Sequence, residues 1–162
     1  MRDLAVSPPN LDLASAEAPA EKMWWDRSIF ISDEQASGGS CPPVIDVTGR
    51  ARILVHGPNQ KLPAGVWRAT VFLHLSPDAA HRRIGVQFGP EPDYTTVDLP
   101  LGVAGDHKVE LTLTAHEAQR YQIRLWLKKA AFHGEIRFAG ASVERIADLP
   151  PATPNQASTE DV

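Results

Sequence analysis

Apolar and polar side chains alternate along most of the chain between residues 44 and 146. Successive side chains of a strand point to opposite faces of a sheet, so this period of two predicts strands with one buried face and one outer face. The clearest strand is predicted over residues 66–75, where Trp67, Val71 and Leu73 share one face. Further strands are predicted over residues 45–47, 51–55, 84–88, 94–99, 109–113, 121–128 and 134–146.

Glycine and proline separate these segments. The triplet Gly57-Pro58-Asn59 is expected to end the strand over 51–55, and the run 62–65 (Leu-Pro-Ala-Gly) suits a type I turn. Gly140 marks an expected bulge in the last strand, and residues 115–120 are the only helix candidate. Roughly seven to nine short strands divided in this way predict an all-β fold of two antiparallel sheets packed as a sandwich.

The predicted core consists of the inward side chains of these strands. It comprises Trp67, Val71, Leu73, Ile84, Val86, Phe88, Val109, Leu111, Ile123, Leu125, Ile136 and Phe138.

A length of 162 residues suits one domain, which we expect to span residues 22–147. Residues 1–21 and 148–162 are rich in Ala, Pro, Ser and acidic residues without a sustained period, so both are expected to be flexible tails. Residues 22–43 include Met23, Trp24 and Trp25, which are too apolar to remain in water. This segment is therefore expected to dock on the sandwich as an early strand or a lid, followed by a loop.

The net charge of −4 is unevenly distributed. Residues 1–43 carry three basic and seven acidic side chains, and residues 148–162 carry three acidic ones, so the strands between them are mildly basic. Their Lys and Arg residues are dispersed, which argues against a nucleic-acid partner. The single cysteine, Cys41, cannot form an internal disulfide. Neither a signal peptide nor a membrane-spanning run is recognisable, so a cytoplasmic location is expected.

Two aromatic side chains interrupt the polar faces of the predicted strands. Trp126 lies on the polar side of the strand over 121–128, and Phe72 on that of the strand over 66–75. A sugar has an apolar C–H face and a rim of hydroxyl groups, so aromatic rings beside planar hydrogen-bonding side chains are typical of a saccharide site. The predicted ligand-binding residues, treated as one outer surface, are Trp126, Phe72, Arg124, Arg68, Gln87, Glu110 and His74.

Two alternatives to this saccharide site remain open. The segment 23–31 or a partner subunit could cover the outer surface instead of a ligand. A second candidate site is a cluster of predicted loops formed by residues 56–60, by Asp93 and Tyr94, and by Phe132 and His133.

Metal and catalytic signatures are weak. The six histidines show no helical i,i+4 pair, and no structural cofactor is expected beyond a calcium ion that Asp46, Asp93 or Asp98 could bind. Motifs of nucleotide-binding and serine-hydrolase sites are missing from the sequence. A glycosidase would need a facing carboxylate pair, which Glu110 and Glu135 could form only on neighbouring strands. The chain is therefore not expected to be an enzyme.

Two stretches resemble a known kind of domain. Residues 49–75 contain a strand that ends in Gly57-Pro58, a Leu-Pro-Ala-Gly turn and then an aromatic-Arg strand, and residues 124–138 resemble closing strands. The pattern is similar to bacterial jelly-roll carbohydrate-binding modules, some of which accompany polysaccharide-biosynthesis proteins. This resemblance, over about residues 44–147, implies a jelly-roll sandwich that binds a bacterial surface or exported polysaccharide. The alternative hypothesis is a protein-interaction or homo-oligomerisation module with a scaffolding or regulatory role.

Overall fold

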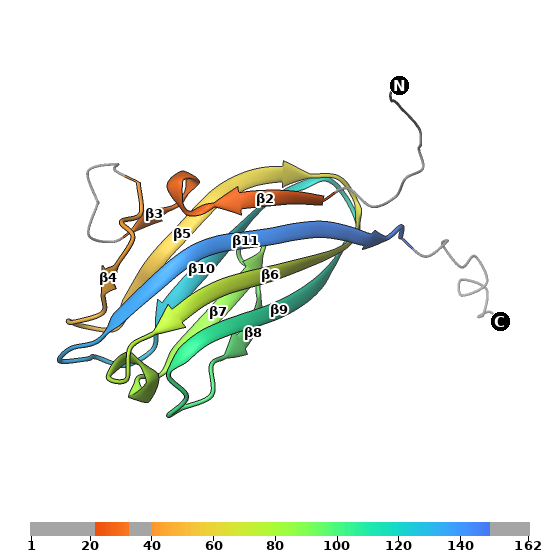
Figure 1. Cartoon of the computed structure of the whole chain (residues 1–162). Helices are drawn as coiled ribbons and strands as arrows, with labels where there is room; N and C mark the ends of the chain where they lie inside the picture. Colours follow the sequence, from red (N-terminus) through yellow and green to blue (C-terminus); the bar gives the residue numbers. More distant parts are fainter. Residues whose placement is uncertain (1–21, 33–39, 150–162) are drawn as a thin grey trace, which may run out of the picture.

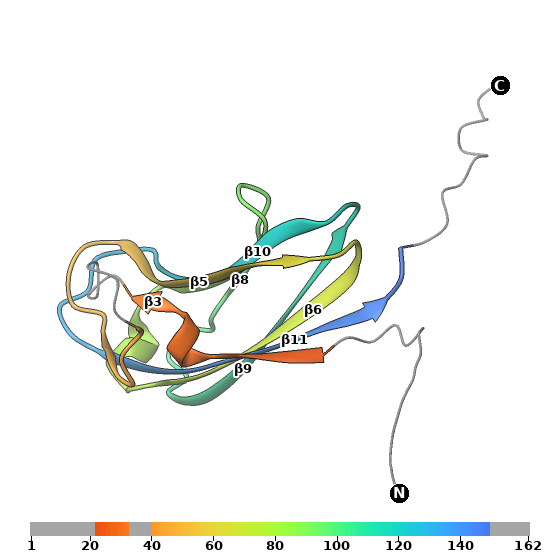
Figure 2. The ribbon, with the colours of Figure 1, turned by 90° about the horizontal axis from the view of Figure 1, so that it is seen from above.

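Two antiparallel sheets packed face to face make up the protein. The computed structural model describes residues 22–32 and 40–149, and Figures 1 and 2 show the two layers from perpendicular directions. The expected flexible tails, 1–21 and nearly all of 148–162, lie outside these ranges. The predicted fold class, an all-β two-sheet sandwich of jelly-roll type, is confirmed.

The first layer, here called the β10 sheet, has the strand order β3-β5-β10-β7-β8. These strands are β3 (Ile31–Ser32), β5 (Arg52–Leu62), β10 (Gln119–Leu127), β7 (Ile84–Gly89) and β8 (Thr95–Asp98). The second layer, here called the β6 sheet, has the order β2-β11-β6-β9, with β4 beside β11. Its strands are β2 (Lys22–Asp26), β11 (Glu135–Ala147), β6 (Gly65–Leu75), β9 (Gly105–Ala115) and β4 (Ile45–Asp46).

Most strands that follow each other in the chain belong to opposite sheets. The chain passes from β5 to β6, back to β7 and β8, and then through β9, β10 and β11. Each such crossing carries the chain from one layer to the other, as the view from above in Figure 2 shows. Apart from β7 and β8, neighbouring strands within a sheet are therefore distant in sequence, a feature typical of jelly rolls.

The core lies between the two sheets. All twelve residues of the predicted core are buried. The N-terminal segment adds two further aromatic side chains, because Trp25 on β2 packs 6.5 Å from Phe88 and Phe30 packs edge-on against Phe138 at 4.7 Å. This segment is therefore part of the sandwich, as a strand in each sheet, and not a lid over it.

Two sequence expectations about β5 and β11 have different outcomes. β5 does not end at residues 57–59 but continues to Leu62, because Asn59, at φ 66°, is accommodated as a bulge between the pairs Gln122–Pro58 and Tyr121–Gln60. The bulge expected at Gly140 is confirmed by the register shift between Phe138 and Gly140.

Helical structure is confined to short 3₁₀ turns in the described ranges. These are η1 (Arg27–Ile29) and η3 (Ala79–His81), while residues 115–120 form the end of β9, a turn and the start of β10. Within the described residues, no helix is long and apolar enough to cross a membrane.

Candidate binding site

The predicted site residues point outward, as expected, but they do not form one surface. Trp126, Arg124 and Gln87 lie on the β10 sheet, whereas Phe72, Arg68, His74 and Glu110 lie on the β6 sheet. The core separates the two groups, so Phe72 and Trp126 cannot contact one ligand ring. The assumption of a single surface is wrong because alternation assigns a face to each strand but does not say which sheet the strand joins.

Arg124 is the centre of the outer face of the β10 sheet. It is opposite His56 on β5 and Gln87 on β7. Its guanidinium carbon lies 4.4 Å from the centre of the Tyr94 ring, and its Nε donates a hydrogen bond to Gln87 Oε1 at 2.9 Å. Gln87 in turn donates from Nε2 to Thr96 Oγ1 at 3.3 Å. The guanidinium is therefore held in one orientation by stacking and by hydrogen bonds.

Gln122 extends this polar row by one outward position on β10. Its Nε2 donates to the hydroxyl oxygen of Tyr94 at 2.6 Å. Tyr94 thus supports two neighbouring side chains, Arg124 through its ring and Gln122 through its hydroxyl. Because two contacts fix the tyrosine, it acts as a rigid base for the polar row.

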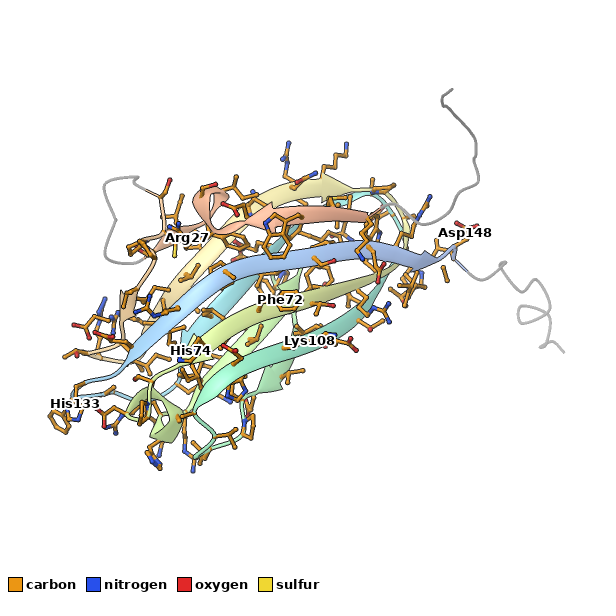
Figure 3. All side chains as sticks on the ribbon, in the orientation of Figure 1. Arg27, Phe72, His74, Lys108, His133 and Asp148 are labelled. Carbon is orange, nitrogen blue, oxygen red and sulfur yellow. The ribbon has the colours of Figure 1, made fainter. Side chains whose placement is uncertain are left out.

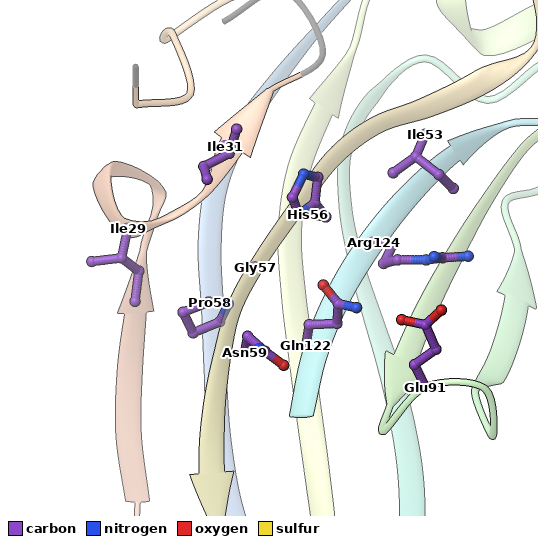
Figure 4. A pocket seen from close by; sticks show the side chains of 10 residues that line it. All are labelled: Ile29, Ile31, Ile53, His56, Gly57, Pro58, Asn59, Glu91, Gln122 and Arg124. Atoms are coloured by element: carbon purple, nitrogen blue, oxygen red, sulfur yellow. The ribbon is translucent and has the colours of Figure 1, made fainter. Parts of the chain in front are cut away.

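A pocket of about 440 Å³ lies beside this row. Its lining comprises Ile29, Ile31, Ile53, His56, Gly57, Pro58, Asn59, Glu91, Gln122 and Arg124. Figure 4 shows the polar side chains of Glu91, Gln122 and Arg124 together at one end, with Ile29, Ile31 and Pro58 at the other. The pocket therefore combines an apolar wall with a set of hydrogen-bonding groups.

Close approach at Gly57 and the pairing of β3 place the apolar residues Ile29 and Ile31 beside β5. Gly57, at φ 139°, allows close approach of the N-terminal segment, because a Cβ at this position would lie 3.3 Å from the carbonyl oxygen of Ile29. Pairing of β3 with β5 places Ile31 opposite His56. Glu91 reaches the pocket from the turn between β7 and β8. Together with Gln122 and Arg124 of β10, four segments distant in sequence therefore build the site.

Trp126 lies next to this pocket, between Ile53 on β5 and Gly85 on β7. Its side chain is half-buried, and Lys128 Nζ lies 5.1 Å from the ring centre. Lys128 also forms an ion pair with Asp98 at 2.9 Å. Lys128 thus covers part of the Trp126 ring, which the sequence pattern had marked as an aromatic residue on a polar face.

The loop cluster expected from the sequence is brought together in part. His56, Pro58 and Asn59 line the pocket and Tyr94 supports it, although residues 56–59 belong to β5 and not to a loop. His133 lies elsewhere, 3.5 Å from Asp78. The sequence prediction missed Ile29, Ile31, Ile53, Glu91 and Gln122; of these, Gln122 carried a signal as a polar outward position on its strand.

The other predicted residues lie on the outer face of the β6 sheet. Arg68 pairs with Glu144 at 2.6 Å, and this hydrogen bond raises the pKa of Arg68 and lowers that of Glu144. His74 Nδ1 lies 2.8 Å from Asp106 Oδ1. Phe72 packs against Trp24 of β2, not against Trp126.

Metal-binding and carboxylate-pair chemistry find little support among the described residues. No group of three or more potential metal ligands occurs there. Of the calcium candidates, Asp46 accepts hydrogen bonds from Thr48, which lower its pKa, and Asp98 pairs with Lys128. Glu110 on β9 and Glu135 on β11 are separated by β6, so they are not on neighbouring strands.

Comparisons with known proteins give only distant likenesses. No family model and no curated protein matches the sequence. Among solved structures, TmCBM61 in complex with β-1,4-galactotriose has a TM-score of 0.47 and 14% identity, covering 79% of this chain and 89% of that one. The K3 cleaved adhesin domain of Lys-gingipain from Porphyromonas gingivalis has a TM-score of 0.48 and 10% identity, covering 77% and 98%.

A family two carbohydrate esterase from Cellvibrio japonicus has a TM-score of 0.35 and 12% identity, covering 83% of this chain and 36% of that one. Every one of these TM-scores is under 0.5. The function of the chain must therefore be inferred from its own residues.

Proposed function

We propose that this chain is a non-catalytic carbohydrate-binding module for a bacterial surface or exported polysaccharide, and that a saccharide binds in the pocket on the β10 sheet. The observation that carries the proposal is the pair of planar polar side chains Arg124 and Gln122, held in place by Gln87 and Tyr94, in a pocket that also has an apolar wall. A sugar ring presents C–H groups to such a wall and hydroxyl groups to such a pair.

Arg124 is suited to bind a pair of adjacent hydroxyl groups. Its Nε is already occupied by Gln87, while no acceptor in the described part of the chain bonds its terminal amino groups. A guanidinium offers donors in a fixed fork, which matches two neighbouring oxygen atoms. Because Tyr94 and Gln87 hold the group in place before binding, little side-chain entropy is lost when a ligand arrives.

The size and charge of the pocket fit a neutral saccharide. A volume of about 440 Å³ is within the usual range for small-ligand sites, roughly 300–1,000 Å³. Its lining contains one fixed cation, Arg124, and one carboxylate, Glu91. Since these charges offset each other, the pocket favours hydroxyl groups over an ionic group.

Calorimetric titration with neutral gluco-, galacto- and manno-oligosaccharides tests the proposal. We expect at least one to bind, and we expect Arg124→Gln to weaken binding about tenfold or more, since two hydrogen bonds worth about 1 kcal/mol each are lost. Arg68→Gln, on the other sheet, is the matched control and should leave this affinity unchanged. The proposal fails if no neutral saccharide binds, or if the two arginine variants weaken binding equally.

A protein-interaction or oligomerisation module is the second candidate function. It is favoured by large apolar side chains exposed along the N-terminal segment, namely Trp24 at 48%, Ile29 at 46% and Ile31 at 39%. Light scattering separates the two functions. A monomer is expected for the saccharide module, whereas a dimer that Trp24→Ala dissociates would favour the interaction module.

A further inference from the structure

We propose that the outer face of the β6 sheet is a second saccharide site, selective for acidic saccharides that contain uronate residues. This inference extends the proposed carbohydrate-binding function to the opposite side of the sandwich. It depends on an aromatic platform, on two cations that flank it, and on the shape of the surface between them.

The aromatic platform consists of Trp24 and Phe72, whose ring centres are 6.0 Å apart. Trp24 remains 48% exposed, yet its orientation is fixed, because Nε1 donates a hydrogen bond to Asp26 Oδ1 at 3.2 Å. Gly140 gives the indole its space, since a Cβ at this position would lie 2.9 Å from Trp24 Cζ2. An exposed ring held in this way is suited to stack on the C–H face of a sugar.

Two cations lie on either side of the β6 strand. Lys108 on β9 is opposite Phe72, and Arg137 on β11 is opposite His74. In the described part of the chain, neither cation forms an ion pair with a carboxylate. The nearby Asp106 contacts His74. Figure 3 shows Phe72, His74 and Lys108 on this face. A carboxylate bound between Lys108 and Arg137 would therefore meet positive charge from both sides.

The surface has room for more than one sugar ring. A hollow of about 420 Å³ lies on the side of His74 and Arg137, and one of about 490 Å³ lies on the side of Trp24 and Arg68. Both hollows are lined by Phe72 and Lys108, so they adjoin each other at these two side chains. A chain of sugar rings can thus stack on the platform while a carboxylate of one ring reaches the cations.

Oligogalacturonate and its methyl ester are the probes for this site. Esterification removes the charge and keeps the sugar rings, so we expect the acid to bind and the ester to bind at least tenfold more weakly. The double variant Lys108→Gln, Arg137→Gln should also lose at least tenfold affinity for the acid. Trp24→Phe should retain more affinity than Trp24→Ala, because the phenyl ring keeps a stacking surface. Urea unfolding confirms that each variant is folded.

Arg124→Gln separates this inference from the proposed function. It should leave oligogalacturonate affinity unchanged while it weakens binding of the neutral saccharide. If Arg124→Gln abolishes binding of the acid, the acid occupies the β10 sheet and the second site is wrong. Absence of binding for oligogalacturonate, oligoguluronate and oligoglucuronate alike, while a neutral saccharide still binds, overturns only the second site. Equal binding of tetraglutamate overturns selectivity for saccharides.

Discussion

The hydroxyl group of Tyr121 is a buried polar group that the fold does not satisfy. The side chain is fully buried beside Phe88, its Oη has no hydrogen-bond partner among the described residues, and burial raises its pKa. Removing an unpaired buried hydroxyl relieves its desolvation cost. We expect Tyr121→Phe to leave the free energy of unfolding unchanged or to raise it by about 1 kcal/mol, measured by urea denaturation. A loss of stability would mean that the hydroxyl has a partner.

The carboxylate of Asp26 links the edge strand β2 to its turn. Hydrogen bonds from Ser28 and from Trp24 lower its pKa from 3.8 to about 2. The charged form is favoured in the folded protein, so its stabilising effect is complete above pH 3.8 and is lost as the pH falls through 2. We expect Asp26→Asn to be less stable than the wild type near neutral pH, with a difference that shrinks between these two values. NMR titration of the carboxyl group checks the cause, and a midpoint of 3.8 in the wild type would contradict it.

Gly140 controls the contact between strands β11 and β2. Its φ is 130°, and a Cβ would collide with the carbonyl oxygen of Trp25 and approach the Trp24 ring. We expect Gly140→Ala to displace β2, to lower the free energy of unfolding by about 2 kcal/mol or more and to shift tryptophan fluorescence. Gly105→Ala is the control, because its φ is 98° but nothing lies within 4 Å of the added Cβ. If Gly140→Ala and Gly105→Ala lower the free energy of unfolding equally, backbone strain alone explains the loss, and the contact with β2 does not contribute.

The strands themselves could be predicted from the sequence, because alternation is a local property. β6 was expected over 66–75 and extends over Gly65–Leu75. The strand over 51–55 was expected to end at Gly57-Pro58-Asn59, because glycine and proline commonly interrupt strands. The expectation fails because the bulge at Asn59 lets β5 keep its pairing with β10 on both sides of that residue. On its other edge, β3 pairs with β5 only at Val55 and His56 and does not reach Pro58.

Partners across the sandwich could not be predicted in the same way. Phe72 was expected to share a surface with Trp126, but its aromatic neighbour is Trp24, which lies two strands away across the β6 sheet. Likewise, Glu91 reaches the pocket from a turn that carries no local binding signal. Such contacts depend on strand order and on bulges, and neither is encoded in the period of a single strand.

The N-terminal segment, residues 22–32, joins the two sheets of the sandwich. Within 11 residues (22–32) it supplies β2 to the β6 sheet and β3 to the β10 sheet, with η1 between them. The same segment buries Trp25 and Phe30 in the core and presents Trp24, Ile29 and Ile31 to solvent. One face of this short stretch therefore stabilises the sandwich, and the other presents the side chains on which the proposed binding depends.

The adjacent residues Trp24 and Trp25 allow these two roles to be separated. Trp25 is 1% exposed and packs against Phe88 of the opposite sheet, so we expect Trp25→Ala to lower the free energy of unfolding by about 3–5 kcal/mol. Trp24→Ala removes a half-exposed ring and should lower the free energy of unfolding clearly less than Trp25→Ala does. It also removes the stacking surface beside Phe72. Urea denaturation of both variants measures the difference. If the two losses are equal, the β2 strand depends on its outer face as much as on its buried one, and Trp24 is then a structural residue before it is a binding residue.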